Sequence, residues 1–191
     1  MLTLRLMNDA EIRLLYTFQM TRDFPPSELK SLTAIMNLRE RGEYDVLEAR
    51  ENGRFIAYAL VYTPHQGRVL LLDYLAVEPE IRCRGYGHQL LESLKAYYAE
   101  KADCILIECE RPKSSPDIEE ARRRIRFYQH ADAVLTNVRV WLFDVEYSIL
   151  VMNCGKCCLD AKRNWAEEIL SIYRQMLPQS LYDRNVRLIR A

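Results

Sequence analysis

The sequence lacks long apolar runs, an excess of charge of either sign and linkers rich in glycine or serine. No apolar stretch reaches the roughly 18 residues that span a bilayer, and residues 1–7 alternate without the basic start of a signal peptide. Lys plus Arg and Asp plus Glu both number 27. This balance gives no general attraction to nucleic acid or anionic membranes. We therefore expect a cytoplasmic protein with no nucleic-acid or membrane partner.

Metal ligands in a suitable arrangement are also missing. The cysteines are Cys83, Cys104, Cys109, Cys154, Cys157 and Cys158. Without an export signal we expect reduced thiols. The last three cysteines have the spacing of half a zinc site, but structural zinc usually takes four ligands. Neither the other cysteines nor the three histidines supply a second pair at metal spacing. We therefore predict no metal.

What is present is a chain of 191 residues, 49% hydrophobic, which suits one domain with a substantial core. An Asn8–Glu11 capping box predicts a helix to about residue 20, and Ser27 predicts the start of a second helix that ends near Gly42. Asn52-Gly53 predicts a β-hairpin. Further helices are expected at 85–101, 117–131 and 160–176, and strands at 1–7, 44–51, 54–63, 68–77, 104–110, 133–142 and 146–153.

This order predicts an α/β (α+β) fold with a mixed, mostly antiparallel central sheet of about six or seven strands, flanked by helices on both faces. One right-handed crossover, from 68–77 through a helix to 104–110, makes a parallel pair. Residues 1–153 are expected to form the core, and 154–191 a C-terminal helical extension packed on the same domain. The pattern after Pro178 gives no assignment.

The most informative stretch is residues 75–87, where a strand ends, a short loop follows, and Gly85 and Gly87 open a helix. Such a loop presents several backbone N–H groups to one point, and the helix dipole adds positive charge there. This suits a pyrophosphate. The loop lacks the Lys-Ser/Thr ending of a Walker loop and the third glycine of a dinucleotide fingerprint.

The spacing Arg82-x-x-Gly85-x-Gly87, preceded by Val77-x-Pro79, resembles the acetyl-CoA signature of the GNAT N-acetyltransferase family. The order of elements over residues 2–153 is similar as well. The resemblance implies the GNAT fold, acetyl-CoA as co-substrate, and pairing of the Leu75 and Val77 backbone with the pantetheine arm. It implies these cofactor-binding residues: Leu75, Ala76, Val77, Arg82, Cys83, Arg84, Gly85, Tyr86, Gly87 and His88.

A second match, Phe127-Tyr128 at a helix end, resembles the family's Phe/Leu-Tyr-x-x-x-Gly-Phe motif and implies that Tyr128 is the general acid for the departing thiolate. Tyr128 also falls on an apolar helix face, so a core position is the alternative. The family's glycine is Asp132 here. Asp tolerates the left-handed conformation that often follows a helix end.

A base is needed because an amine must lose a proton before it attacks a thioester. Along 104–110, Leu106, Glu108 and Glu110 alternate onto one strand face. Crowded, desolvated carboxylates have raised pKa values. We therefore predict Glu108 as the base or the acceptor of a water relay. Glu110 and Asp73 are candidates for substrate binding, although Asp73 could equally be hydrogen-bonded to a neighbouring loop.

The resulting hypothesis is an N-acetyltransferase, an acyl-CoA-dependent enzyme that moves an acetyl group to a primary amine of a small molecule or peptide by direct attack in a ternary complex. The alternatives are an acyl-CoA-binding sensor or structural module without turnover, and a transferase for longer acyl chains. A homodimer is left open, and no pattern in the sequence identifies the acceptor.

Overall fold

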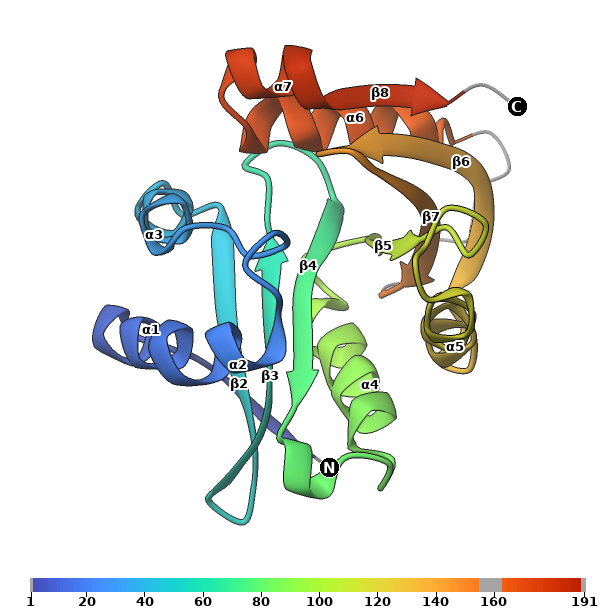
Figure 1. Cartoon of the computed structure of the whole chain (residues 1–191). Coiled ribbons are helices and arrows are strands. Elements are labelled where there is room, and N and C mark those ends of the chain that lie inside the picture. Colours follow the sequence, from blue (N-terminus) through green and yellow to red (C-terminus); the bar gives the residue numbers. More distant parts are fainter. Residues whose placement is uncertain (1, 155–162, 190–191) are drawn as a thin grey trace.

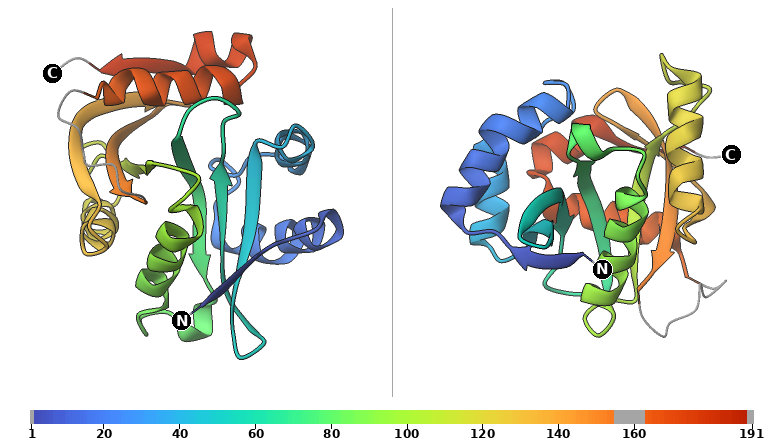
Figure 2. Two further views of the ribbon diagram at one scale, coloured as in Figure 1. Left: turned by 180° about the vertical axis from the view of Figure 1, so that it is seen from behind. Right: turned by 90° about the horizontal axis from the view of Figure 1, so that it is seen from below.

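The computed structural model of the chain describes residues 2–154 and 163–189. Its centre is an eight-stranded sheet in the order β1-β2-β3-β4-β5-β7-β6-β8. Only β4 and β5 are parallel neighbours in this sheet. Helices cover both faces (Figures 1 and 2). The predicted mixed fold with its single parallel crossover is confirmed, with one strand more than expected.

The strands are β1 (Thr3–Leu6), β2 (Tyr44–Glu51), β3 (Arg54–Tyr62), β4 (Val69–Val77), β5 (Cys104–Glu110), β6 (Val134–Leu142), β7 (Val145–Asn153) and β8 (Val186–Ile189). The helices are α1 (Asp9–Leu15), α2 (Thr21–Asp23), α3 (Leu32–Glu40), α4 (Tyr86–Tyr98), α5 (Ile118–Gln129), α6 (Trp165–Met176) and α7 (Gln179–Asn185). A π-helical turn, η1 (Tyr16–Met20), joins α1 to α2, and a 3-10 turn, η2 (Pro79–Ile81), follows β4.

The first two helices test the predicted caps. The Asn8 capping box is present, with Asn8 Oδ1 accepting from Glu11 N at 3.0 Å and Asn8 N donating to Glu11 Oε2 at 2.7 Å. The Ser27 cap is wrong, because α3 starts at Leu32 and Ser31 Oγ caps it. Between them the Tyr74 hydroxyl accepts from Lys30 N and donates to the carbonyl of Glu28. That tertiary contact holds backbone groups that a first helical turn would have used.

The chain beyond Pro178 forms α7 and then β8, which pairs antiparallel with β6. Cys157 and Cys158, and residues 160–162 of the predicted last helix, lie outside the described residues. The four described cysteines, Cys83, Cys104, Cys109 and Cys154, are not paired with one another in disulfides. No group of three His, Cys, Asp or Glu side chains within 2–154 and 163–189 is placed to hold a metal ion. No helix in that part of the chain is long and apolar enough to cross a membrane.

Two hydrophobic clusters fill the two sides of the sheet. One packs under α1, α3 and α6, and it includes Leu106. The other packs under α4 and α5, and it includes Ile105, Ile107 and Cys109. The predicted alternation along β5 is therefore confirmed, and Glu108 points to the side of α6.

A β-bulge in β4 positions the site. Val61 of β3 pairs with Leu72 and Leu60 pairs with Tyr74, so Asp73 is an extra residue without a partner. The β4–β5 ladder runs only to the pair Leu72–Ile107. Beyond it β4 continues along β3, while β5 continues along β7 and turns away (Figure 1). The two inner strand edges therefore diverge and leave a gap in the middle of the sheet.

Candidate active site

A cleft of about 1670 Å³ opens where β4 and β5 diverge. One end is lined by the end of β4, by the loop between β4 and α4 (residues 78–85, called the glycine loop below), by the start of α4, and by α5. The other end is lined by residues 27–31, α3, the end of β5, the β6–β7 turn and the start of α7, and residues 23–25 lie between the two ends. Thirteen of the fourteen sequence-predicted site residues line this cleft, and Arg84 is the exception.

The glycine loop is fastened to β4 by a side chain. Arg82 Nε donates to the Val77 carbonyl at 2.9 Å, and Arg82 Nη2 donates to Asp23 Oδ1 at 2.8 Å. The Arg82 guanidinium is therefore already hydrogen-bonded within the protein. Arg82 can contact a ligand through its backbone N–H group. Cys83 has a φ of 61° and Gly85 a φ of 82°, and these left-handed residues turn the chain into α4. The first N–H groups of the helix lack intrahelical partners.

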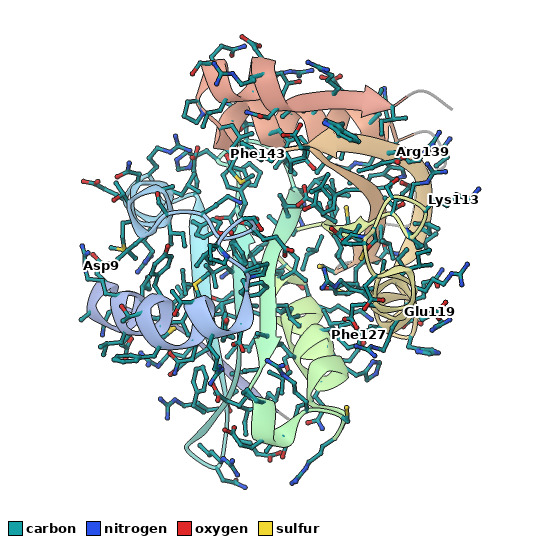
Figure 3. All side chains as sticks on the ribbon, viewed as in Figure 1. Asp9, Lys113, Glu119, Phe127, Arg139 and Phe143 are labelled. Carbon is teal, nitrogen blue, oxygen red and sulfur yellow. The ribbon has the colours of Figure 1, made fainter. Side chains whose placement is uncertain are left out.

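Gly87 lies where the start of α4 meets α5. A Cβ atom at Gly87 would come within 2.9 Å of Phe127 Cε2 and 3.9 Å of Val77 Cγ2. Figure 3 shows Phe127 on α5, between that helix and α4. A side chain at Gly87 would therefore have to displace the Phe127 ring or the start of α4, so the close packing of α4 on α5 depends on this glycine.

The end of β4 offers a ligand an edge without a partner strand, on which Arg82 occupies the Val77 carbonyl. Ala59 and Ala57 of β3 pair with Leu75 and Val77 on one side. On the other side the ladder with β5 has already ended. An extended ligand that carries amide groups could take the place of the missing strand. The fit of a pantetheine arm followed by a pyrophosphate at the glycine loop is therefore good.

Tyr128 is 9% exposed and lines the cleft from α5. Burial, and less strongly Cys109, raises the pKa of the Tyr128 hydroxyl, which therefore stays protonated at neutral pH. No hydrogen-bond partner of this hydroxyl is found in the described ranges. Asp132 follows the end of α5, and its φ of 63° is the left-handed conformation expected at that position.

Glu108 faces the cleft from β5 and accepts a hydrogen bond from the Tyr173 hydroxyl of α6. Burial raises the pKa of Glu108 to about 7, and the Asp73 charge adds to this, while the bond from Tyr173 opposes it. A carboxyl group with a pKa near neutrality can take up and release a proton under ordinary conditions. Sequence reasoning missed Tyr173, because it lies on the apolar face of α6 and only the fold brings it to Glu108.

Asp73 is held by protein groups. Lys30 Nζ donates to Asp73 Oδ1 at 2.7 Å, and the Tyr44 hydroxyl donates to Asp73 Oδ2. Lys30 belongs to the loop before α3, so the neighbouring-loop arrangement considered from the sequence is present. Glu110 accepts from Ser115 Oγ at 2.7 Å and lies at the strand end. No pattern in the sequence pointed to Lys30.

A model of the acetyltransferase (GNAT) family matches residues 10–131. The matched family consists of acyl-CoA-dependent transferases by class. The match covers well over half of the 191 residues, and the chain belongs to the GNAT family of N-acetyltransferases.

The uncharacterised N-acetyltransferase YhfO of Bacillus subtilis (strain 168) is 32% identical over 101 residues, which cover 49% of this chain and 68% of the relative. A putative GNAT acetyltransferase of Bacteroides thetaiotaomicron superposes with a TM-score of 0.73 at 20% identity, over 90% of this chain and 96% of that one. The spermidine N-acetyltransferase of Vibrio cholerae, solved with CoA and spermine, gives 0.61 at 13% identity, over 80% and 95%. At these identities the two structures show the fold alone.

Proposed function

We propose that this chain transfers the acetyl group of acetyl-CoA to the primary amine of an acceptor by direct attack in a ternary complex. The observation that carries the proposal is the cleft itself. One continuous hollow joins a glycine loop, an unpaired strand edge, a protonated phenol at Tyr128 and a carboxyl group of near-neutral pKa at Glu108.

The cofactor half would bind through backbone groups. Leu75 and Val77 would pair with the pantetheine arm, and the N–H groups from Arg82 to His88 would hold the pyrophosphate. Side chains in this loop serve other contacts. Arg82 fastens the loop, and the Tyr86 hydroxyl donates to Glu51 Oε2 at 2.7 Å. A backbone N–H near Val77 would stabilise the oxyanion formed when the amine attacks the thioester carbonyl.

Proton transfer would fall to two residues on opposite sides of the sheet. Glu108 accepts a proton from the attacking amine, directly or through a water. Tyr128 donates a hydrogen bond to the sulfur as the C–S bond breaks. A phenol with a raised pKa gives up its proton reluctantly to a thiolate whose thiol has a pKa of about 8.5. We therefore assign Tyr128 hydrogen-bond donation, with protonation of the sulfur completed from solvent.

The C-terminal extension is part of this proposal. Residues 154–191 are inferred to complete the same domain, since α6 supplies Tyr173 to Glu108 and β8 extends the sheet beyond β6. A cytoplasmic location and a homodimer stay predictions from the sequence.

The test starts with thermal unfolding in acetyl-CoA. A ligand at about 100 times its Kd adds roughly 2.7 kcal/mol to the free energy of unfolding, so a clear upward shift of Tm is expected. Acetyl-CoA consumption is then followed with a panel of amines. A thermal shift without turnover on any amine would favour the sensor alternative, and no shift at millimolar acetyl-CoA would contradict the whole proposal.

A further inference from the structure

The acceptor end of the cleft carries exposed apolar side chains. Phe143 is 45% exposed and Leu181 is 39% exposed, and both line the cleft. Phe143 N donates to the carbonyl of Asn185, which ties the β6–β7 turn to α7. Figure 3 shows Phe143 beside α7. Leu177 lines the same end. An exposed apolar surface in a hollow calls for a ligand that covers it.

The conformation of Phe143 is an independent sign of function. Phe143 and Asp144 form the two-residue turn between Leu142 and Val145, with φ values of 45° and 64°. A bulky residue is strongly disfavoured there. A second two-residue hairpin among the described residues, Asn52-Gly53, has φ values of 49° and 80° and uses the residues that such a turn prefers. The strained choice occurs where the turn lines the cleft, as expected for a side chain kept for binding.

Carboxylates surround the same end. Glu28, Glu108 and Glu110 all line it. Two nearby cations are already paired, Lys30 with Asp73 and Arg41 with Glu43. Arg124 is a further cation lining the cleft. An approaching ammonium group therefore meets Glu28, Glu110 and, in its ionised form, Glu108, against the further cation Arg124.

The register gives the separation between charge and apolar wall. Tyr147 of β7 is opposite Glu110 of β5. Val145 is two residues from Tyr147 along β7, which corresponds to about 7 Å of strand, and Phe143 lies in the turn beyond Val145. Side chains shorten this gap, so an acceptor that reaches both ends needs a chain of several bonds between its amine and its apolar part.

Resting on the acetyltransferase function proposed above, we propose that the acceptor is a free primary amine joined by a short chain to an aromatic or branched apolar group. The amine is directed to Glu28, Glu108 and Glu110. The apolar group lies on a wall made by Phe143, Leu177 and Leu181. This wall includes residues 177 and 181, which lie outside the part that the family model matches.

The test compares kcat/KM for ethylamine, 2-phenylethylamine, 4-phenylbutylamine and spermidine at saturating acetyl-CoA. Covering a phenyl group on the wall should give the better arylalkylamine an advantage of at least about 30-fold over ethylamine. Phe143→Asn should reduce this advantage about 10-fold, mainly through KM. Its Tm should be no lower than that of the wild type, because Asn suits the turn better than Phe.

Leu181→Ala should act in the same direction as Phe143→Asn. Leu188→Ala is the matched control, since Leu188 is 41% exposed on β8 and does not line the cleft. It should leave the amine preference unchanged.

Equal rates for ethylamine and the arylalkylamines, unaffected by Phe143→Asn, would overturn the inference and leave the acetyltransferase function intact. A preference for spermidine would also overturn it, because spermidine has no aromatic or branched apolar group. So would a variant that changed the choice between acetyl-CoA and longer acyl-CoA, because the wall would then hold the acyl chain. Absence of both acetyl-CoA binding and turnover would instead remove the proposed function itself.

Discussion

The two ends of the cleft are built in different ways. The cofactor end comes largely from one stretch, residues 75–88, and presents mainly backbone. The acceptor end is assembled from segments that are far apart in the chain, and it presents side chains: acids from β5, Phe143 from a hairpin turn and Leu181 from α7. A backbone site needs glycines at fixed spacing and so leaves a signature. A side-chain site formed by long-range packing leaves none.

The largest expected effect is a loss of activity at the acceptor end that leaves acetyl-CoA binding at the cofactor end intact. Glu108→Gln removes the proposed base, and kcat/KM should fall about 10²–10⁴-fold, while the acetyl-CoA thermal shift remains. Glu92→Gln, on the exposed side of α4, is the control and should retain activity. Similar turnover in Glu108→Gln would show that another group or a water takes the proton.

The same residue gives a pH dependence. Because the pKa of Glu108 is raised to about 7, the rate of the wild type should rise with pH through that value. The unfolded chain has the ordinary pKa of 4.5 and loses this proton first, so Glu108 makes stability fall as pH rises from 4.5 to about 7. Unfolding of Glu108→Gln should lack this component, and urea unfolding at pH 5 and pH 8 measures it.

The next largest effect comes from disturbing the packing at the cofactor end of the cleft. Gly87→Ala brings a methyl group against the Phe127 ring, and overpacking of this kind costs about 1–3 kcal/mol. Acetyl-CoA affinity, measured by calorimetry, should fall as the start of α4 is displaced. Adding Phe127→Leu makes room and should restore part of both stability and affinity. If Gly87→Ala binds acetyl-CoA normally, the close packing is unrelated to the cofactor.

A smaller effect should show that Tyr173, in the C-terminal extension, influences the pKa of the proposed base Glu108. Tyr173→Phe removes the hydrogen bond that lowers the pKa of Glu108, so the pH at which the rate rises should move upward. A shift of one unit corresponds to about 10-fold in rate at low pH and to little at high pH. Tyr62→Phe is the matched control, because the buried Tyr62 hydroxyl has no partner among the described residues. An unchanged pH profile would show that Tyr173 has a packing role in the core and does not tune the pKa of Glu108.

The smallest effect compares two glycines of the same conformation. Gly85 and Gly53 have φ values of 82° and 80°, and no atom lies within 4 Å of a Cβ added to either. Alanine in this conformation costs about 1 kcal/mol at each site, and thermal unfolding should show similar losses. Only Gly85→Ala should also weaken acetyl-CoA binding. Equal affinity in both variants would mean that the loop tolerates strain without losing the site.

Local patterns predicted the elements that local contacts decide. The strand Tyr44–Glu51 and the capping box at Asn8 follow from alternation and from side-chain spacing within a few residues. The faces of β5 follow from strict alternation, which placed Glu108 apart from Ile107 and Cys109. The glycine loop follows from its spacing.

Other features depend on contacts that no local pattern contains. Ser27 has the composition of a cap, but the Tyr74 hydroxyl, more than forty positions away, holds the backbone that the cap would have served. The bulge at Asp73 depends on the register with β3. Tyr173 looked like a core residue because it is one, at 0% exposure, and its hydroxyl alone reaches the site.

Asp23 gives the two ends of the cleft a common support. Its buried carboxylate accepts hydrogen bonds from Arg82 of the glycine loop, Arg22 of α2 and the Tyr58 hydroxyl, and the segment that leads along the cleft to α3 begins at the next residue, Phe24. Leaving a buried carboxylate unpaired is costly, so the loop and this segment are held in a fixed relation. We therefore expect occupancy of one end of the cleft to change the free energy of binding at the other, and such coupling is reciprocal. The cofactor and the acceptor are thus expected to bind cooperatively through Asp23.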